Sequence, residues 1–577
     1  MGSKRNWYRG IIWSVLLMPL FLFSIGSRSQ QDPQDPRPST VAGRSAVYAP
    51  HGVIAASQPL ASSAGLAVLQ QGGNAIDAAV TAAAVLCLVE PHMTGIGGDV
   101  FAIVWSADEG SLTGLNASGR SGSLMTREEL VRREFRRMPS SGVEPITVPG
   151  ALSGWAALLE RFGTITLAQA LQPAIRLAEE GFPVSPIIAR QWSAQRRKLM
   201  RNEGAKATFL FDGERAPRPG DWFKNPDLAA SFRLIAQEGP SALYGGELGK
   251  RIVDHLAEAG GFLTLEDMED HKPVWVDPIS AEYNGYTLWE LPPNGQGIAA
   301  LEMLRILEPY DLETMGHNSA AYLHHLIEAK KLAFADLGRY VGDPDFMDVT
   351  PEDLLSDEFI EQRRSRLDPK QAAERQGPGQ AVTSSETIYL TVADASGNMV
   401  SFINSNFGYF GSGIVVPGTG FVMQNRGSGF TMTEERANTV APRKRPFHTL
   451  IPAFVTRTVQ SEGGSPGSSV QQPWMSYGVM GGSMQPQGHV QVLFNLILFG
   501  MDIQEAIDAP RFRHLSGLRV VLESPIPEDI RRLLESMGHQ IGNENSSSFG
   551  GGQGIIKLAN GWVAGSDPRK DGSAMGY

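Results

Sequence analysis

The sequence predicts a mixed α/β (α+β) fold in which a mainly helical part is followed by a strand-rich part. Of its 577 residues, 42% are hydrophobic and 19% are charged, a composition typical of a globular protein. Apolar residues recur at helical spacing in residues 58–90 and through most of residues 150–340. From Thr387 onward polar and apolar residues alternate, which is typical of strands with one buried face.

The helical part contains predicted turns and strands. The Ala-rich stretch 58–90 is interrupted at Gly72-Gly73, which predicts two helices. The turn Thr94-Gly-Ile-Gly-Gly98 lacks the Gly-Lys-Ser/Thr ending of a nucleotide-binding loop, so a tight connection between helix and strand is favoured. Three further elements are expected: a strand over 100–105, strands around 282–291 and a helix over 319–339.

Two segments have the composition of connections. Residues 366–382 are rich in Pro, Gly, Gln and charge and contain little that can pack, which predicts a mobile linker. Residues 461–472 are rich in Gly and Ser and are predicted to form a surface loop within one domain.

Charge and cysteine content exclude some functional classes. The formal net charge is −11, which argues against nucleic acid as the main partner because phosphate binding needs a basic surface. The single cysteine, Cys87, cannot form an intrachain disulfide or a thiolate zinc site. It lies in an apolar run, so we expect a small buried hydrophobe. No metal and no cofactor are predicted.

The N-terminus has the order of a secretory signal. Lys4, Arg5 and Arg9 precede an apolar run that ends near Ile25, followed by small and polar residues. We predict a signal peptide over residues 1–29, a flexible leader over 30–44, and export of the folded part, to the periplasm or outside the cell. An uncleaved membrane anchor is the alternative, and no later segment is apolar enough to span a membrane.

A hairpin at the start of the strand-rich part places hydroxyl groups together. Residues 387–392 and 399–405 alternate as strands around a turn at 394–398. A turn centred on Ser396 puts Thr387 opposite Ser405, and Thr391 on the same face as Thr387 because strand side chains alternate. The pattern alone does not indicate a catalytic role, since threonine is a common strand residue.

Nine segments, in order along the chain, resemble the motifs of the gamma-glutamyltranspeptidase family, and the resemblance extends from about Ser45 to Tyr577. These segments are Glu90-Pro-His-Met-Thr-Gly-Ile-Gly-Gly98, Val148-Pro-Gly-Ala-Leu-Ser-Gly-Trp155, Gly342-Asp-Pro-Asp-Phe346, Glu386-Thr-Ile-Tyr-Leu-Thr-Val-Ala-Asp-Ala-Ser-Gly-Asn398, Phe410-Gly-Ser-Gly413, Lys444-Arg-Pro446, Gly481-Gly-Ser483, Ala509-Pro-Arg-Phe512 and Gly565-Ser-Asp-Pro-Arg569.

The resemblance implies an N-terminal nucleophile hydrolase with an αββα sandwich, in which two stacked, mainly antiparallel sheets lie between helical layers. It implies a precursor that cuts its own Glu386–Thr387 bond. The products would be a large chain, 45–386, and a small chain, 387–577, associated as a heterodimer. The new α-amine of Thr387 has a pKa of roughly 7.7–8.0, so it can act as the base for the threonine hydroxyl.

Further site residues are implied by the same resemblance. Gly481 and Gly482 correspond to the oxyanion hole, where backbone N–H groups stabilise the developing charge. Ser405 and Thr391 are expected to hydrogen-bond and orient the hydroxyl of Thr387.

The substrate pocket departs from the family pattern. The arginine that binds the glutamyl α-carboxylate corresponds best to Arg120, displaced by two positions, and the acid that binds the α-amine is Gly429, with Arg426 nearby. The usual Ser-Ser pair is His448-Thr449, and the segment between Phe430 and Lys444 is shorter, which predicts a more open pocket.

These departures predict a carboxylate-bearing acyl group, held by Arg120 and Arg426 with His448 and Thr449 as polar neighbours. The expected substrate is a small-molecule amide whose gamma-glutamyl or similar acyl group passes to Thr387 and then to water or an amine. A cephalosporin or glutaryl acylase-like amidohydrolase, and an uncleaved non-catalytic family member, are the alternatives.

Overall fold

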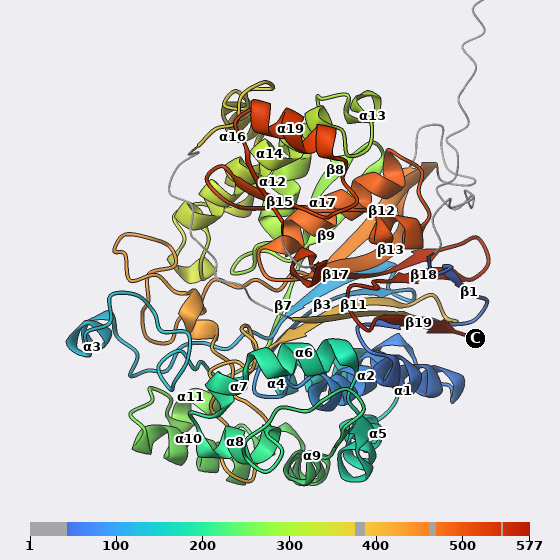
Figure 1. Cartoon of the computed structure of the whole chain (residues 1–577). Coiled ribbons are helices and arrows are strands. Elements are labelled where there is room, and N and C mark those ends of the chain that lie inside the picture. Colours follow the sequence, from blue (N-terminus) through green and yellow to red (C-terminus); the bar gives the residue numbers. More distant parts are fainter. Residues whose placement is uncertain (1–42, 375–386, 461–468, 544–545) are drawn as a thin grey trace, which may run out of the picture.

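Two stacked β-sheets lie between two layers of helices in the computed structural model (Figure 1). The structure describes residues 43–374, 387–460, 469–543 and 546–577. The arrangement is the predicted αββα sandwich, and every strand pairing within the two large sheets is antiparallel.

Each large sheet has seven strands drawn from both halves of the sequence. The first sheet has the order β1 (Val47–Ala49), β18 (Trp562–Ser566), β17 (Gly551–Lys557), β13 (Ser469–Met480), β12 (Ala453–Gln460), β9 (Tyr286–Glu290) and β8 (Ile279–Tyr283). The second has the order β19 (Ser573–Gly576), β2 (Val53–Ala56), β10 (Ile388–Ala393), β11 (Met399–Ser405), β3 (Asp99–Ser106), β4 (Ser111–Asn116) and β7 (Val274–Val276). Two small sheets contain β14 (Phe512–Ser516), β15 (Arg519–Leu522) and β16 (Gln540–Gly542), and β5 (Phe182–Pro183) and β6 (Trp222–Phe223).

The helices segregate by layer (Figure 1). On the side of the second sheet lie α1 (Pro59–Gln70), α2 (Ala75–Val89), α4 (Ala151–Phe162), α5 (Leu167–Glu180), α6 (Pro186–Ala194), α7 (Arg196–Leu199), α8 (Glu203–Phe209), α9 (Pro226–Glu238), α10 (Glu247–Glu258) and α11 (Leu265–Glu269), while α3 (Arg127–Arg132) projects from one end. On the side of the first sheet lie α12 (Gly297–Leu307), α13 (Leu312–Met315), α14 (Ala320–Tyr340), α15 (Pro351–Leu355), α16 (Asp357–Arg364), α17 (Met484–Ile497), α18 (Ile503–Asp508) and α19 (Glu528–Ser536).

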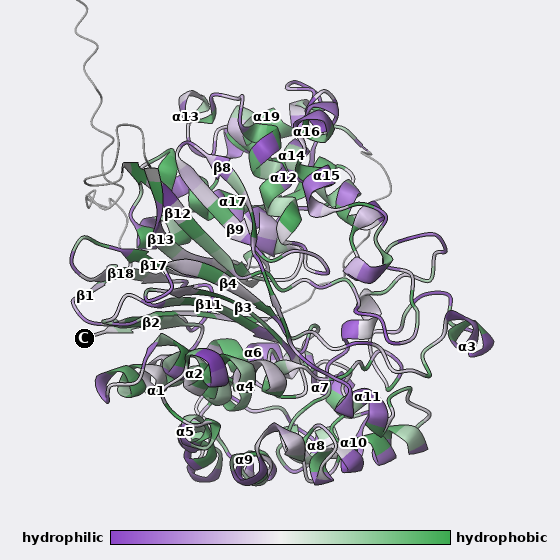
Figure 2. Cartoon of the chain, turned by 180° about the vertical axis from the view of Figure 1, so that it is seen from behind, coloured by the Kyte–Doolittle hydropathy of each residue, from purple (hydrophilic) through white to green (hydrophobic). Residues whose placement is uncertain are grey.

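Strand alternation separates the core into layers. On β10, Ile388, Leu390 and Val392 pack into the cluster that contains the helices of the second sheet's outer face. Tyr389 and Ala393, on the opposite face of β10, pack into the cluster between the two sheets. The hydrophobic residues in Figure 2 accordingly lie on the strands and on the helices that cover them. Thr387 shares its face with Tyr389, so its side chain belongs to the layer between the sheets.

Most of the predicted elements are confirmed. The break at Gly72-Gly73 separates α1 from α2, whose Asn74 forms a capping box with Asp77. The predicted strand at 100–105 is β3, the strands near 282–291 are β8 and β9, and the helix at 319–339 is α14.

Other predictions are corrected or fall outside the described residues. Residues 469–472 belong to β13 rather than to the loop predicted over 461–472, because Gln471 and Gln472 pair with β12. The described part of the predicted linker, residues 366–374, is packed rather than mobile, because Leu367 and Ala372 are buried and the N–H of Ala372 donates to Met537 O at 2.7 Å. The signal, most of the leader, residues 375–382 of the predicted linker and Glu386 lie outside the described residues.

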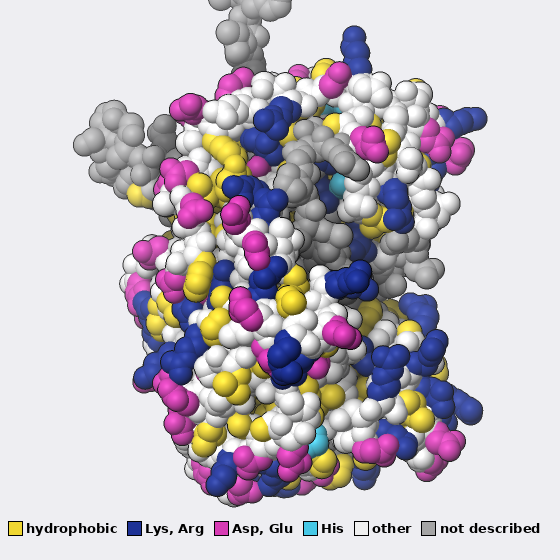
Figure 3. All heavy atoms as spheres, turned by 90° about the vertical axis from the view of Figure 1, so that its left-hand side faces the viewer, with side chains coloured by type: hydrophobic (Ala, Val, Ile, Leu, Met, Phe, Trp, Pro, Cys, Tyr) yellow, Lys and Arg dark blue, Asp and Glu magenta, His cyan; other side chains and the backbone are white. Residues whose placement is uncertain are grey.

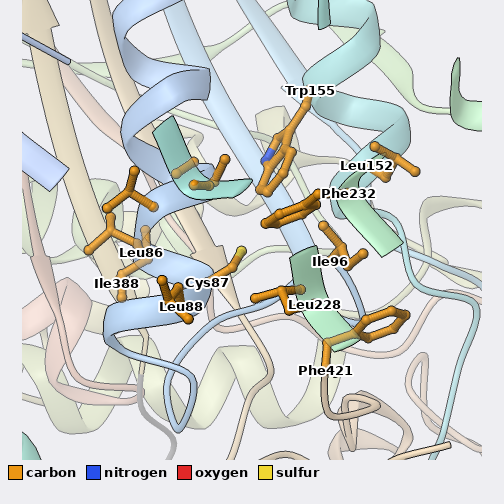
Figure 4. Packing of buried hydrophobic residues seen from close by; sticks show 14 of the residues in the cluster. Leu86, Cys87, Leu88, Ile96, Leu152, Trp155, Leu228, Phe232, Ile388 and Phe421 are labelled. Atoms are coloured by element: carbon orange, nitrogen blue, oxygen red, sulfur yellow. The ribbon is translucent and has the colours of Figure 1, made fainter. Parts of the chain in front are cut away.

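Cys87 is a packed hydrophobe, as expected. It is buried on α2 beside Leu86 and Leu88, in a cluster that includes Ile388 and Trp155 (Figure 4). Acidic and basic side chains are interspersed over the face in Figure 3. Within the described ranges, no helix has both the length and the apolarity needed to cross a bilayer.

Candidate active site

The hydroxyl of Thr387 lies where the hairpin prediction puts it. Ile388 pairs with Asn404 in the β10–β11 register, so Thr387 and Ser405 are the next pair outward, as the sequence predicts. Thr387 is fully buried, and its Oγ1 donates to Ser405 Oγ over 3.2 Å. Ser405 Oγ also accepts from the backbone N–H of Phe407 at 2.8 Å, which fixes the serine hydroxyl against the backbone.

The structure corrects the role expected for Thr391. Four residues along a strand amount to about 13 Å, too far for a hydrogen bond to Thr387. Thr391 Oγ1 instead lies 2.7 Å from Ser476 Oγ on β13, so it joins the two sheets. It shares a face with Thr387, as predicted, but it does not touch that hydroxyl.

The glycine pair at 481–482 lies at the same end of the sandwich as Thr387. Thr391 on β10 hydrogen-bonds Ser476 on β13. Two residues earlier on β10 and two residues later on β13, Tyr389 packs over Gly478. The same step brings Thr387 opposite Met480, the last residue of β13. Gly481 follows with φ 126° and Gly482 with φ 58°, values that L side chains rarely adopt.

Arg426 forms the charged part of the site. It begins a short 3-10 turn, Arg426–Gly429, and is fully buried. Its Nη1 donates to Thr449 Oγ1 at 3.0 Å, and its guanidinium lies 4.3 Å from the centre of the Phe407 ring. Burial lowers its pKa to about 9, although the nearby carboxylate of Asp99 acts in the opposite direction.

Asp99 is the functional candidate that the sequence interpretation missed. Its Oδ2 lies 3.7 Å from Arg426 Nε and 3.1 Å from His448 Nε2. Its Oδ1 accepts from the backbone N–H groups of Gly119 at 3.1 Å and Gly150 at 3.2 Å. Burial raises the pKa of Asp99 to about 6, against the opposing effect of Arg426 and the hydrogen bonds.

Strand pairing places Asp99 near Thr387. Asp99 begins β3 directly after Gly98 and pairs with Ser405 across the sheet, so the charged group lies one strand from the Thr387–Ser405 pair. The available signal was an acidic residue at the first position of a strand that follows a glycine-rich turn. The strand order that brings β3 beside β11 is not visible in local sequence.

His448 is a neutral neighbour of Asp99. Burial and the charge of Arg426 hold its pKa well below the usual value. Its Nδ1 accepts from the backbone N–H of Leu450 at 3.2 Å, so the proton is on Nε2, which donates to Asp99. Its ring stacks on Phe101 at 4.5 Å. His448 thus orients the carboxylate without adding charge.

Arg120 does not join this group. Its Nη1 lies 2.8 Å from Asp343 and its Nη2 3.2 Å from Asp345, and about a third of the side chain is exposed. It lines a separate cavity of 510 Å³. Of the four predicted substrate-binding residues, Arg426, His448 and Thr449 come together around Asp99, whereas Arg120 is neutralised by acidic partners of its own.

Several buried polar atoms in Arg426 and in three glutamines of the neighbouring segments lack a hydrogen-bond partner. Among the described residues these atoms are Arg426 Nε and Nη2, Gln424 Oε1, Gln296 Oε1 and Gln485 Nε2. Gln424 Nε2 donates to Asp99 at 3.1 Å, and Gln485 Oε1 accepts from the backbone of Ile451 at 3.1 Å. Such atoms are rare in folded proteins and cost free energy unless a ligand or water satisfies them.

One group of residues has metal-ligand types. His324, Glu328 and His539 converge in the described part of the chain, around α14. His324 Nδ1 and His539 Nε2 form a hydrogen bond of 2.9 Å, and Lys331 Nζ lies 2.7 Å from Glu328 Oε1. The positive charge of the Lys331 ammonium group would repel a metal ion bound at these three residues.

Comparison with known proteins identifies the family. The sequence model described as Gamma-glutamyltranspeptidase matches residues 61–577. The chain belongs to the gamma-glutamyltranspeptidase family. This confirms the resemblance on which the αββα prediction depended.

Members of this family that resemble the chain differ in their named substrates. The chain is 37% identical over 528 residues to the glutathione hydrolase-like YwrD proenzyme of Bacillus subtilis (strain 168), covering 90% of this chain and 97% of the relative. It is 35% identical over 545 residues to the oxamate amidohydrolase proenzyme of Klebsiella pneumoniae, covering 91% and 98%. The crystal structure of a cephalosporin acylase from Bacillus halodurans superposes with a TM-score of 0.86 at 41% identity, covering 94% and 99%.

Proposed function

We propose that this chain is a self-processing amidohydrolase that cuts its Glu386–Thr387 bond and then uses Thr387 as nucleophile. The observation that carries the proposal is that Thr387, the residue directly before β10, is buried and donates its hydroxyl to Ser405 Oγ. Cleavage exposes an α-amine on the same residue, and because free α-amines have pKa values of roughly 7.7–8.0, this amine can serve as the base. The names of the two relatives, both proenzymes, support processing.

Interleaved strands keep the two proposed chains together. The large chain, 45–386, supplies β1, β8 and β9 to the first sheet, and the small chain, 387–577, supplies the other four strands. In the second sheet, β10 of the small chain lies between β2 of the large chain and β11. Cutting one bond therefore removes no strand pairing, and the product is a tightly associated heterodimer.

The glycine turn supplies the proposed oxyanion hole. The backbone N–H groups of Gly481 and Gly482 follow the end of β13, at the end of the sandwich that holds Thr387. Donors aimed at the developing oxyanion contribute about 3–4 kcal/mol each in well-studied acyl transfer.

Arg426 defines the proposed acyl group. Among the described residues its Nη2 has no hydrogen-bond partner, and its Nε lies 3.7 Å from Asp99 Oδ2, whose carboxylate balances the charge. A carboxylate on the substrate can accept a hydrogen bond from this Nη2. Residue 429 is glycine, so the position expected to bind an ammonium has no acid. The pocket suits a carboxylate-bearing acyl group, with or without an amine.

The relatives' names agree with this substrate class. Oxamate carries a carboxylate next to its amide, and the glutamyl group of glutathione carries one on its α-carbon. Acyl transfer from such an amide to Thr387, then to water or an amine, accommodates glutathione-like and acylase-like activity. Export of the mature protein after removal of residues 1–29 completes the proposal.

Three anilides test the proposal. Gamma-glutamyl, glutaryl and butanoyl p-nitroanilides differ only in the amine and the carboxylate. We expect the mature protein to hydrolyse the glutaryl compound at least as well as the gamma-glutamyl compound, and the butanoyl compound about 100-fold less well in kcat/KM. Hydrolysis of the gamma-glutamyl compound alone would overturn the assignment of the pocket. A single intact band on denaturing electrophoresis would overturn processing.

A further inference from the structure

Gln296 connects the two halves of the proposed site. It is fully buried immediately before α12, in the connection from β9. Its Nε2 donates to the backbone carbonyl of Thr449 at 2.7 Å and to that of Gly482 at 2.8 Å. Thr449 binds Arg426, and Gly482 belongs to the glycine turn, so one amide spans the acyl pocket and the oxyanion turn.

The orientation of this amide follows from its partners. Both contacts are carbonyl oxygens, which only accept, so the nitrogen of the Gln296 side chain must face them. Both protons of the amide are therefore used. The Oε1 atom, on the other side, has no partner among the described residues.

Neighbouring contacts restrain the same three segments. The backbone N–H of His448 donates to Asn294 O at 2.8 Å, so residues 294–296 run beside 448–449. The N–H of Gln485 donates to Gly482 O at 3.1 Å, while its side chain accepts from Ile451. Gln296 and Gln485 therefore both join Gly482 to the segment around residues 449–451, and Gln296 does so through its side chain alone.

The connection also crosses the proposed processing site. Gln296 lies in the large chain, whereas Thr449 and Gly482 lie in the small chain. After processing, the large chain would hold two catalytic segments of its partner through one side chain. A buried glutamine whose two amide protons both form hydrogen bonds is held in one orientation, which suits it to this role.

We propose that Gln296 is a positioning residue that sets the distance between the oxyanion turn and the Arg426 pocket, so that an acyl group whose carboxylate is bound has its carbonyl in the oxyanion hole. The inference rests on the proposed function. It predicts that Gln296 affects turnover of every acyl group and, in addition, the preference for a carboxylate.

Substitution of the side-chain amide tests this role. Gln296→Met keeps the length of the side chain and removes both donors. We expect kcat for the glutaryl and butanoyl anilides to fall about 10- to 100-fold, and the glutaryl preference in kcat/KM to fall about tenfold. Gln172→Met is the matched control, because Gln172 is an exposed glutamine that donates to the carbonyl of Ala168 on α5. Rates are normalised to the fraction of chains that start at Thr387, measured by intact mass.

Gln296→Glu supplies a readout that a purely structural role would not move. A protonated carboxyl retains one donor, whereas a carboxylate faces two carbonyl oxygens. Burial raises the pKa of the introduced group, so Gln296→Glu should be more active than Gln296→Met at pH 5 and lose this advantage as pH rises toward 9. This variant also serves if Gln296→Met does not fold.

The outcomes separate this inference from the proposed function. Equal kcat and equal selectivity in Gln296→Met, Gln296→Glu and Gln172→Met at every pH would overturn the role of Gln296. Residual anilide hydrolysis by Thr387→Ala, assayed in parallel, would overturn the proposed function itself. An equal loss of kcat for both anilides without loss of glutaryl preference would show that Gln296 acts only on the glycine turn. That result would contradict its proposed role in setting the distance between the turn and the Arg426 pocket.

Discussion

The proposed nucleophile region and the proposed acyl pocket lie one strand apart but are built differently. Thr387 and Ser405 are 18 residues apart, on one hairpin whose strands pair directly. The pocket joins Asp99 from β3 to Arg426 and His448 from the loops that follow β11. The first region is a local structure without ionisable side chains, whereas the second depends on tertiary contacts and buried charge. Substitutions in the two regions should therefore differ in kind.

Removal of the nucleophile should have the largest effect. Thr387→Ala lacks the hydroxyl that attacks both the precursor bond and the substrate, so we expect an unprocessed chain and loss of activity by more than about 10³-fold for every acyl group. Denaturing electrophoresis and anilide hydrolysis measure both results. Thr387→Ser is the control, since it keeps a hydroxyl and should retain processing. Two chains from Thr387→Ala would contradict the proposed chemistry.

Removal of the pocket charge should be large but selective. Arg426→Met should lower kcat/KM for the glutaryl anilide by about 100-fold and leave the butanoyl anilide within about threefold, because only the former carries the carboxylate. The change leaves Asp99 buried without its cation, which is expected to cost about 3–5 kcal/mol of stability.

Arg426→Met with Asp99→Asn provides the control for that loss. The double variant removes both charges, so thermal unfolding should recover most of the stability while the selectivity stays lost. An equal fall in activity toward both anilides would show that Arg426 acts on the fold rather than on the substrate.

Removal of the orienting hydroxyl should lower kcat by a smaller factor, and by the same factor for every acyl group. Ser405→Ala deletes the acceptor of the Thr387 hydroxyl, and we expect kcat to fall about tenfold for all three anilides. Thr391→Val is the comparison, because its hydroxyl joins Ser476 instead. It should cost about 1 kcal/mol of stability and leave kcat within about threefold. Equal kinetic losses in the two variants would restore the role first expected for Thr391.

Asp99 should contribute to the pH dependence of the free energy of unfolding. Burial raises the pKa of Asp99 from 3.8 to about 6, so the folded chain holds this proton more tightly than the unfolded chain does. The stabilisation is present below about pH 4 and is lost as pH rises to about 6, by up to about 3 kcal/mol. Chemical denaturation between pH 4 and 7 should show this slope in the wild type and a flatter one in Asp99→Asn. Identical slopes would contradict the assigned pKa shift.

The same contrast explains what sequence could predict. Alternation around a short turn predicted the hairpin, its register and the Thr387–Ser405 contact, since all the information lies in 19 residues. The helix break at Gly72-Gly73 and helix α14 were predictable for similar local reasons. The αββα arrangement came from the family motifs, because periodicity does not report which sheets stack.

The pocket shows what local patterns leave out. Arg120 and Arg426 are both basic residues near family motifs, but Asp343 and Asp345 neutralise the first, and only tertiary structure places those acids beside it. Asp99 could not be predicted from local sequence, because its partners are distant in the chain, at residues 119, 150, 424, 426 and 448. Gln296 was missed for the same reason, since two distant carbonyl groups define its role.

Sequencing the N-termini of the purified protein tests the central claim most directly. If Thr387 cuts the chain and becomes the nucleophile, one of the two chains begins Thr-Ile-Tyr-Leu, starting at Thr387. The other begins after residue 29 if the predicted signal peptide is removed. A single chain that continues through Glu386–Thr387, with anilide hydrolysis intact, would contradict the proposed mechanism.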